Sequence, residues 1–308
     1  SYALCEAGIK LQDVDYIVFY DKPSLKFERI LKTHLTNVPR SFRSFRMGMP
    51  TWLREKFFLK RSILKKLKNS FGEVFKNPIL FTEHHFSHAA SAFYPSPFQE
   101  AVVLTVDGVG EWATTTVAIG TQNKLDIVKE IHFPHSLGLL YSAFTHYTGF
   151  RVNSGEYKVM GLAPYGEPKY KDLILEKLID VKEDGSFRLD QSYFNYMTGR
   201  TMINKKFSDL FGQPVRKPDS EPLTQFHMDI AASIQVVVEK ILLQMVRSLA
   251  TEYKIPNLCL AGGVALNCVA NGKILRDKCF KDIWIQPAAG DAGGALGAAL
   301  AIWHSKLN

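Results

Sequence analysis

Two histidines one helical turn apart are the first residues in this sequence with an evident chemical use. His84 and His88 lie four positions apart in TEHHFSHAASAF, where the alanines favour a helix. Residues i and i+4 share one face of a helix, so both imidazoles could bind a single metal ion. A zinc protease would need glutamate directly after the first histidine, whereas this chain has His85. The alternative is a pair of ordinary core or surface histidines.

Two aspartates stand beside glycines at predicted turns. Asp107 ends a β-rich run in AVVLTVDGVGEWATTTVAIG, where Asp-Gly predicts a tight hairpin with glycine at positive φ. The N–H groups of Gly108 and Gly110 could also approach phosphate oxygens, because no Cβ stands in the way. Asp291 follows Gly290 and by itself is expected to be the N-cap of a C-terminal helix.

Two further glycine-rich stretches could hold a nucleotide. In AGGVALN, Gly262 and Gly263 precede a predicted helix whose N-terminus could bind a phosphate or an adenosine, and Asn267 follows one turn later. In NSGEYKVMGLAPYGEP, Lys158 could neutralise phosphates and Glu156 could accept from a ribose hydroxyl. Each stretch also fits an ordinary loop, so neither identifies a ligand by itself.

The elements that must position these residues alternate between strands and helices. Strands near 16–20 and 78–82 each lead into a helix, and the helix with the histidines must end before Pro95. The other predictions, in chain order, are two strands within 101–120, a strand over 124–133, a helix that begins near 137 and ends at Gly149, a polar surface excursion over 166–222, a long core helix over 224–252 and two strand-turn-helix units over 257–303. This alternation predicts a layered α/β sheet with ligands at the strand ends.

Composition excludes several classes of protein. An apolar fraction of 46% with 22% charged residues is ordinary for a folded soluble protein. No run of 18 uninterrupted apolar residues is present, so a membrane-spanning helix is not expected. The four cysteines are too sparse for a disulfide framework, and the chain shows no basic-then-apolar leader. We therefore expect a cytoplasmic protein.

The net charge of +8 is concentrated in the first third of the chain. Residues 1–100 contain 16 Lys and Arg against 9 Asp and Glu. The densest stretch, 54–76, also has apolar residues at helical spacing, which predicts a surface helix with a solvated basic face. The alternative is attraction of an anionic substrate or nucleic acid, but no recognised binding motif supports a nucleic-acid partner.

Seven segments, in their order along the chain, resemble the family of O-carbamoyltransferases that modify antibiotics and nodulation factors. They are DYIVFYDKP, EHHFSHAASAFYPSPF, AVVLTVDGVGEWATTT, SLGLLYSAFTHYTGF, GEYKVMGLAPYG, AGGVALNCVANGKI and QPAAGDAGGALGAAL. The resemblance covers nearly the whole chain. It implies an α/β fold of the duplicated actin/hexokinase-like (ASKHA) two-lobe type, in the branch shared with the subunit that transfers threonylcarbamoyl to tRNA.

The resemblance also implies two ligands. Members of the family bind a divalent metal (Fe, Mn, Zn or Mg) with two histidines and two aspartates, which match His84, His88, Asp107 and Asp291. An adenine nucleotide, ATP or carbamoyl-adenylate, is held between the lobes. The matching residues are Asp107, Gly108, Gly110, Glu111, Glu156, Lys158, Gly262, Gly263 and Asn267.

Enzymes of this family work in two steps. A YrdC-like domain makes carbamoyl-adenylate from carbamoyl phosphate and ATP, and the domain that this chain resembles then transfers the carbamoyl group to a hydroxyl of a small-molecule or sugar acceptor. A metal near the adenylate can polarise the carbonyl, and a neighbouring group can take the hydroxyl proton. His88 and His135 are the candidates for that base.

The chain departs from the family pattern at both ends. Family members begin with a β-hairpin that carries the first phosphate-binding loop, and they continue into the YrdC-like domain. We therefore expect a truncated piece, with a partial first lobe over 1–98 and a second lobe over 99–308. Such a piece is not expected to make carbamoyl-adenylate alone, and an incomplete edge of the first sheet could favour a homodimer.

Two other functions stay open at this point. The shared branch and the basic stretch would fit a tRNA threonylcarbamoyl-transferase-like subunit, although DGVGE replaces the glycine-rich SGG-type hairpin of that family. A chain without its YrdC-like domain could also be a nucleotide-binding scaffold that catalyses nothing.

Overall fold

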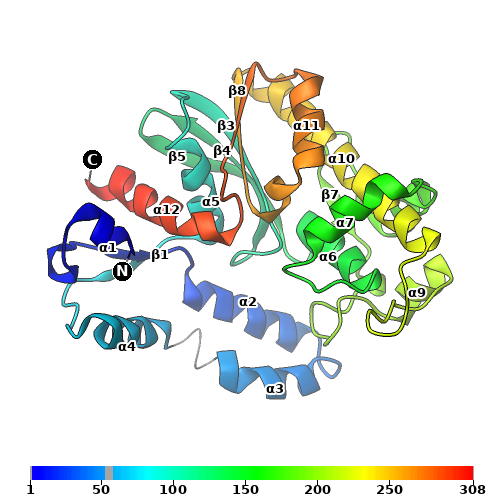
Figure 1. Cartoon of the computed structure of the whole chain (residues 1–308), viewed down its shortest axis with the longest axis horizontal. Coiled ribbons are helices and arrows are strands. Elements are labelled where there is room, and N and C mark those ends of the chain that lie inside the picture. Colours follow the sequence, from blue (N-terminus) through cyan, green and yellow to red (C-terminus); the bar gives the residue numbers. More distant parts are fainter. Residues whose placement is uncertain (1, 53–57, 308) are drawn as a thin grey trace.

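A mixed five-stranded sheet forms the centre of the computed structural model, which describes residues 2–52 and 58–307 (Figure 1). Strands β3 (Glu100–Val106), β4 (Ala113–Thr121) and β5 (Lys124–His132) form an antiparallel meander. Strands β8 (Asn257–Ala261) and β9 (Asp282–Ile285) continue the sheet in parallel from β3, in the order β5–β4–β3–β8–β9. The predicted α/β fold, its hairpin and its two C-terminal strand-helix units are confirmed.

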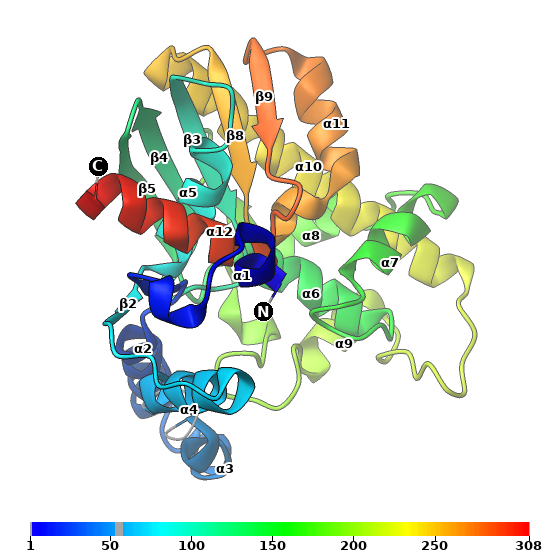
Figure 2. The same cartoon turned by 60° about the vertical axis from the view of Figure 1, so that its left-hand side comes forward.

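Helices cover both faces of this sheet (Figure 2). Successive side chains of β3 point to opposite faces, so Val102 and Leu104 pack in one apolar cluster while Ala101 and Val103 pack in another. The first cluster includes helices α6 (Leu137–Tyr147), α10 (Gln225–Tyr253) and α11 (Cys268–Asp277). The second includes α5 (His84–Phe93) and α12 (Asp291–Ile302). The central strands are therefore buried on both sides, which explains their nearly continuous apolar sequences.

A smaller part of the molecule is built around two short parallel strands. Strands β1 (Ile17–Phe19) and β2 (Ile79–Phe81) pair residue for residue, and β1 also packs against α12. Around them lie α1 (Tyr2–Ala7), α2 (Pro23–Thr36), α3 (Phe42–Trp52) and α4 (Leu59–Phe71). This arrangement brings the turn after β1 to the N-terminus of α5. The domain boundary near residue 98 stays a prediction.

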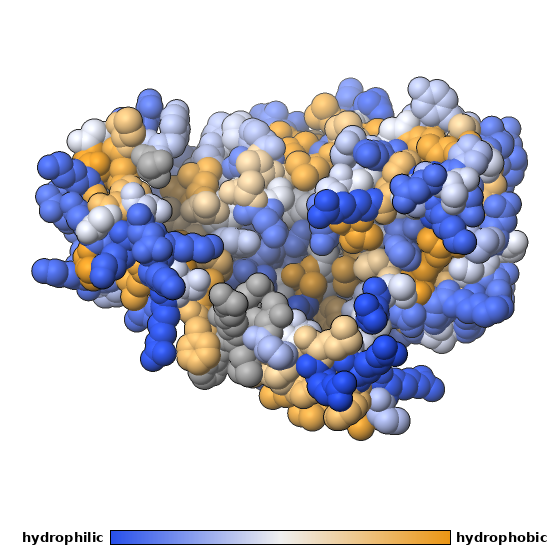
Figure 3. Space-filling model, turned by 60° about the horizontal axis from the view of Figure 1, so that its bottom comes forward, coloured by the Kyte–Doolittle hydropathy of each residue, from blue (hydrophilic) through white to orange (hydrophobic). Residues whose placement is uncertain are grey.

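The basic stretch forms a surface helix, as predicted. Residues 54–57 of this stretch lie outside the described part of the chain, and α4 covers 59–71. Apolar residues of α4, including Leu64 and Leu67, pack against a small cluster around Leu11. Its lysines at 65, 66 and 68 are exposed, and Figure 3 shows hydrophilic side chains projecting from this side of the molecule. Among the described residues, no helix combines the length and apolarity needed to span a membrane.

The segment 166–222 contains more structure than its sequence predicts. It forms α8 (Lys171–Lys177), the hairpin of β6 (Ile179–Val181) and β7 (Phe187–Leu189), and α9 (Lys205–Phe211), after the short helix α7 (Glu156–Leu162). Phe187 and Phe207 are buried in the main apolar core. These elements are three to seven residues long and are separated by polar turns, so no helical or strand periodicity is evident in the sequence. The connection 212–224, with its three prolines, is irregular as we expected, and so is the stretch 194–204 before α9.

Candidate metal centre

The two histidines of α5 face one another across a single helical turn. His84 is the first residue of the helix and His88 follows on the same face, and both side chains are fully buried. Their Nε2 atoms lie 3.1 Å apart, and the two rings are nearly perpendicular. Both nitrogens therefore point at one common position, as the spacing predicts.

Two carboxylates complete the group from distant parts of the sequence. Asp107 follows the last residue of β3, and its Oδ2 lies 3.0 Å from Nε2 of His84 and 3.8 Å from Nε2 of His88. Asp291 starts α12, and its Oδ1 lies 3.6 Å from each of the same two nitrogens. One donor atom from each of the four residues lies within 4.8 Å of all the others. The structure thus brings together the four residues that the resemblance implies.

Close packing of α12 on α5 places Asp291 at this centre. A Cβ on Gly297 would lie 1.8 Å from the backbone oxygen of Ser87 in α5, and one on Gly294 would lie 2.8 Å from the ring of Tyr20. The glycines of α12 therefore allow a contact that no larger residue permits. The predicted N-cap role of Asp291 is wrong, because Gly290 occupies the cap and Asp291 is the first helical residue. Its side chain points toward the two histidines.

The four donors match the ligands that divalent transition metals use in proteins. Imidazole nitrogens and carboxylate oxygens together suit zinc, iron and manganese. The Nδ1 atom of His88 is buried and has no hydrogen-bond partner among the described residues. Two Nε2 atoms at 3.1 Å cannot both carry a proton without repulsion, whereas a cation between them would accept both lone pairs. The residues present therefore fit a divalent metal ion.

In the structure, His84 bridges two carboxylates. Burial alone lowers the pKa of His84, but hydrogen bonds to Asp107 and Asp21 outweigh burial and raise this pKa to about 9. Burial likewise raises the pKa of Asp107, and the hydrogen bond from His84 outweighs it and holds the pKa far below its usual range. The neighbouring His85 differs, since burial lowers its pKa to about 3 and keeps it neutral.

This raised pKa predicts how the stability of the metal-free protein changes with pH. The unfolded chain protonates His84 at about 6.5 and the folded chain at about 9, so the stabilisation is complete below pH 6.5 and is lost as pH rises to 9. We expect a loss of roughly 1 kcal/mol per pH unit in this window. Urea unfolding with a chelator present measures it, and the difference should vanish in His84→Gln. A wild-type slope equal to that of the variant would contradict the assignment.

The glycine turns near the centre are packing positions. Gly262 has a φ of 89°, and a Cβ there would lie 2.3 Å from the backbone oxygen of Val106. The N–H of Gly263 donates to Oδ1 of Asp107 at 2.9 Å, which orients the carboxylate whose other oxygen faces the histidines. Gly263 therefore orients one of the four candidate ligands, a contact that its sequence context does not reveal.

The predicted tight turn after β3 is wrong in its geometry. Residues 107–112 form a longer loop, and neither Gly108 nor Gly110 is among the described residues with positive φ. A Cβ on Gly110 would lie 2.9 Å from the ring of His85 and 3.0 Å from Cβ of His84. The small size of Gly110 thus lets the loop pack closely on α5.

Glu111 from the same loop anchors two backbone segments. Its buried carboxylate accepts from the N–H of Lys22 at 2.7 Å and from the N–H of His84 at 3.0 Å. A carboxylate at the N-terminus of α5 is favoured by the unpaired N–H groups and the helix dipole there. Glu111 thereby joins the start of α2 to the start of α5.

The other residues predicted to bind nucleotide lie in α7 and before α11. Glu156 accepts from the hydroxyl of Ser142 and from the N–H groups of Asn153 and Gly155. Lys158 lies 5.8 Å from the ring centre of Phe150. Their contact with a nucleotide stays a prediction.

Asn267 has two structural contacts. Its side chain caps α11 by accepting from the N–H of Ala270, and its amide donates to Oε1 of Gln235 at 2.9 Å. His135, the second candidate base, accepts from the N–H of Leu189 in β7 through Nδ1. Burial lowers the pKa of His135. That hydrogen bond directs the ring to β7, and its role as a base stays a prediction.

Two residues of the centre were missed by the sequence analysis. Tyr20 and Asp21 are the first two residues after β1. Oδ1 of Asp21 lies 2.7 Å from Nδ1 of His84, and Tyr20 packs its ring against that of His84. The available signal was their position in FYDKP, at the end of a predicted strand. Many aspartates at strand ends only start turns, so sequence alone could not connect this one with a residue 63 positions later.

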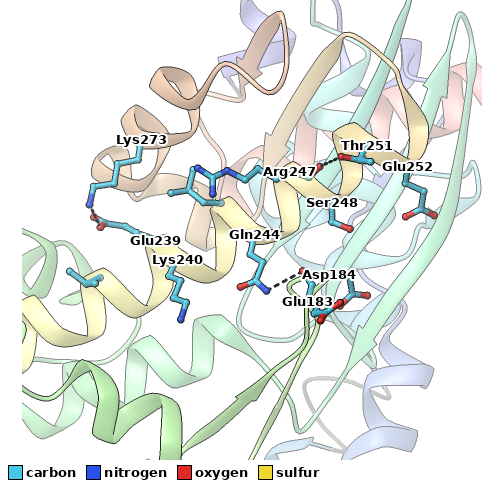
Figure 4. Close-up of a pocket in the computed structure, with 12 residues that line it drawn as sticks. Glu183, Asp184, Glu239, Lys240, Gln244, Arg247, Ser248, Thr251, Glu252 and Lys273 are labelled. Carbon is cyan, nitrogen blue, oxygen red and sulfur yellow. Dashed lines mark hydrogen bonds and ion pairs between the residues drawn. The ribbon is translucent and has the colours of Figure 1, made fainter.

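A groove lies elsewhere on the molecule, away from these residues. It has a volume of about 850 Å³ and lies along α10, beside α11 and the turn between β6 and β7 (Figure 4). Glu239 and Lys273 form an ion pair at one end, and Gln244 donates to the backbone of Glu183 at the other. None of the predicted site residues lines it.

The chain belongs to the carbamoyltransferase family. The family model for the carbamoyltransferase N-terminus matches residues 1–300. The uncharacterised protein sll1178 of Synechocystis sp. is 64% identical over the whole of this chain, and nodulation protein NolNO of Sinorhizobium fredii is 37% identical over 97% of it. These alignments cover 50% and 40% of the two relatives, so the chain spans about half their length or less.

A comparison with solved structures gives one further similarity. The crystal structure of T. kodakarensis HypF matches 78% of this chain and 38% of its own, with a TM-score of 0.39 and 14% sequence identity.

Proposed function

We propose that this chain transfers a carbamoyl group from carbamoyl-adenylate to a hydroxyl of a small-molecule or sugar acceptor, with a divalent metal at His84, His88, Asp107 and Asp291. The observation that carries the proposal is the convergence of these four donors in a member of the carbamoyltransferase family. Their positions 84, 88, 107 and 291 span most of the chain, and they meet only through the packing of α5, β3 and α12.

The proposed step exchanges one oxygen for another at the carbamoyl carbon. The acceptor oxygen forms a bond to this carbon, the bond to the phosphate oxygen of AMP breaks, and the hydroxyl proton passes to a base. A bound metal would supply Lewis-acid stabilisation of charge on the carbonyl or on the departing AMP. His88 and His135 are the proposed bases, and His88 could take the proton only while its Nε2 is not bound to the metal.

The chain's own residues prepare the site for this chemistry. The N–H of Gly263 binds one carboxylate oxygen of Asp107 and Nε2 of His84 binds the other, so the carboxylate is ordered before a ligand arrives. The centre is buried on the α5 side, while Asp291 is 62% exposed and gives access from solvent. A site with one open side can admit a substrate and still exclude most water.

The finer features of the fold belong to the same proposal. We infer an actin/hexokinase-like origin, with the nucleotide bound near Asp107–Glu111, Glu156, Lys158, Gly262, Gly263 and Asn267. Since the N–H of Gly263 already donates to Asp107, a phosphate would compete with that carboxylate for it. A YrdC-like domain is the proposed source of carbamoyl-adenylate and the proposed partner.

Metal analysis and reconstitution test the function. The purified 308-residue chain is first assayed for bound metal and for nucleotide binding by calorimetry, with and without a chelator. It is then mixed with a separately produced YrdC-like domain, carbamoyl phosphate, ATP and a panel of sugar and polyol acceptors. We expect about one metal ion per chain and carbamoylated product only when both proteins are present.

Two results would count against the proposal. A chain that contains no metal and takes none up would remove the site on which the chemistry depends. A metal-bound chain that binds nucleotide but yields no product would leave a nucleotide-binding scaffold as the better description. Binding of tRNA in a gel shift, lost steeply with added salt, would redirect the function to the tRNA branch.

A further inference from the structure

The side of His84 that faces away from the metal centre is bound by a second buried carboxylate. Nδ1 of His84 lies 2.7 Å from Oδ1 of Asp21, a residue only 4% exposed. The same oxygen lies 2.7 Å from Nζ of Lys26, whose side chain is 13% exposed. The contact joins the turn after β1 to the first residue of α5, two parts of the chain 63 residues apart.

Because of this contact, the two ring nitrogens of His84 have different roles. A carboxylate can only accept, so Nδ1 must carry the proton that Asp21 binds. In the neutral imidazole the lone pair then lies on Nε2, the nitrogen that faces His88, Asp107 and Asp291. Tyr20 packs on the ring with centroids 5.6 Å apart and restricts its rotation.

We propose that Asp21 is a positioning residue for the metal centre, which holds His84 in the tautomer and orientation that present Nε2 to the ion. The inference rests on the proposed metal site and adds a residue that binds no metal itself. Carboxylates that bind the second nitrogen of a metal-bound histidine commonly make the ligand more basic and fix its ring.

Lys26 completes the arrangement from α2. Its ammonium pairs with Asp21, so two hydrogen bonds hold the carboxylate ionised although burial opposes this. Asparagine at position 21 would differ from aspartate because its amide can donate a hydrogen bond. Its amide can donate to Nδ1 of His84, which places the remaining proton on Nε2 and blocks the ligand atom.

Asp21→Asn is therefore the informative variant. We expect calorimetric titration of the chelator-stripped chain with zinc chloride to show affinity lowered by about 10- to 100-fold. In the zinc-loaded wild-type chain, NMR with ¹⁵N-labelled histidine should show His84 with a proton on Nδ1 and the metal on Nε2. The hydrogen-bonded Nδ1 proton should be lost in Asp21→Asn.

Asp229→Asn is the matched control for simple loss of a buried ion pair. Asp229 is also buried, and it pairs with Lys169 at 2.7 Å in a part of the structure built from α10 and the chain before α8. We expect this control to keep wild-type zinc affinity even if it is less stable. A lowered zinc affinity in Asp21→Asn alone would then show that Asp21 acts through His84. Loss of a buried carboxylate elsewhere would leave the zinc affinity unchanged.

The outcomes separate the inference from the proposed function. Zinc binding that is unchanged in Asp21→Asn, or reduced equally in both variants, would overturn the role of Asp21 and leave the metal site intact. A wild-type chain that takes up no zinc would overturn the metal site, and the positioning role with it. If Asp21→Asn fails to fold, the wild-type spectrum decides: an unprotonated Nδ1 on His84 refutes the inference, and a hydrogen-bonded Nδ1 proton supports it.

Discussion

Replacement of His88 by alanine is expected to release the bound metal and to lower carbamoyl transfer by about a thousandfold, since metal assistance supplies several kcal/mol. His88 is buried, and its Nε2 atom lies within 3.8 Å of a donor atom of each of the other three residues. Alanine removes that ligand and leaves His84, Asp107 and Asp291. Metal analysis and a reconstituted transfer assay measure the two effects.

His132→Ala provides the control for this variant. His132 is a solvent-exposed histidine at the end of β5 that pairs with Glu130. Its replacement should change neither the metal content nor the rate. If His88→Ala kept its metal and half or more of the wild-type rate, the assignment of the centre to these four residues would be wrong.

Replacement of Gly297 by alanine is expected to destabilise the protein by about 3 kcal/mol, near the upper end of the cost of overpacking a core. The new Cβ would lie 1.8 Å from the backbone oxygen of Ser87, which cannot rotate away. Helix α12 must therefore move away from α5, and Asp291 at the start of α12 moves with it. We expect a lower urea midpoint and also weaker metal binding.

Gly161→Ala is the matched control, with an effect of the opposite sign. Gly161 lies in the exposed helix α7, and a Cβ there would have no neighbour within 4 Å. Alanine in such a position commonly stabilises a helix by up to about 1 kcal/mol. Urea unfolding of both variants tests the pair. Equal stability changes in the two would contradict the close contact between α12 and α5.

The sequence by itself determined the main elements outside 166–222 and one side of the site. The i, i+4 spacing of His84 and His88 predicted a shared face, and the structure confirms it because helix periodicity is local. The apolar periodicity of 224–252 predicted the core helix for the same reason. The family followed from long motifs in a fixed order, and the family match over 1–300 confirms it.

Only the tertiary structure decided how the distant residues meet. Asp107 and Asp291 are 184 positions apart, and each looked like a turn or a cap in its local context. The parallel pairing of β3 with β8 and the packing of α12 on α5 bring them to one point. No local pattern encodes that meeting, because it depends on contacts between chain segments that the sequence separates.

The same reason explains the residues that were misassigned or missed. Asp21 binds His84 across a sheet-to-helix contact, and Gly263 binds Asp107 across two paired strands. Both partners were visible only as turn residues in sequence. Gly110 is small because α5 packs against its loop. Local propensity specified what these residues can do, whereas tertiary packing determined what they contact.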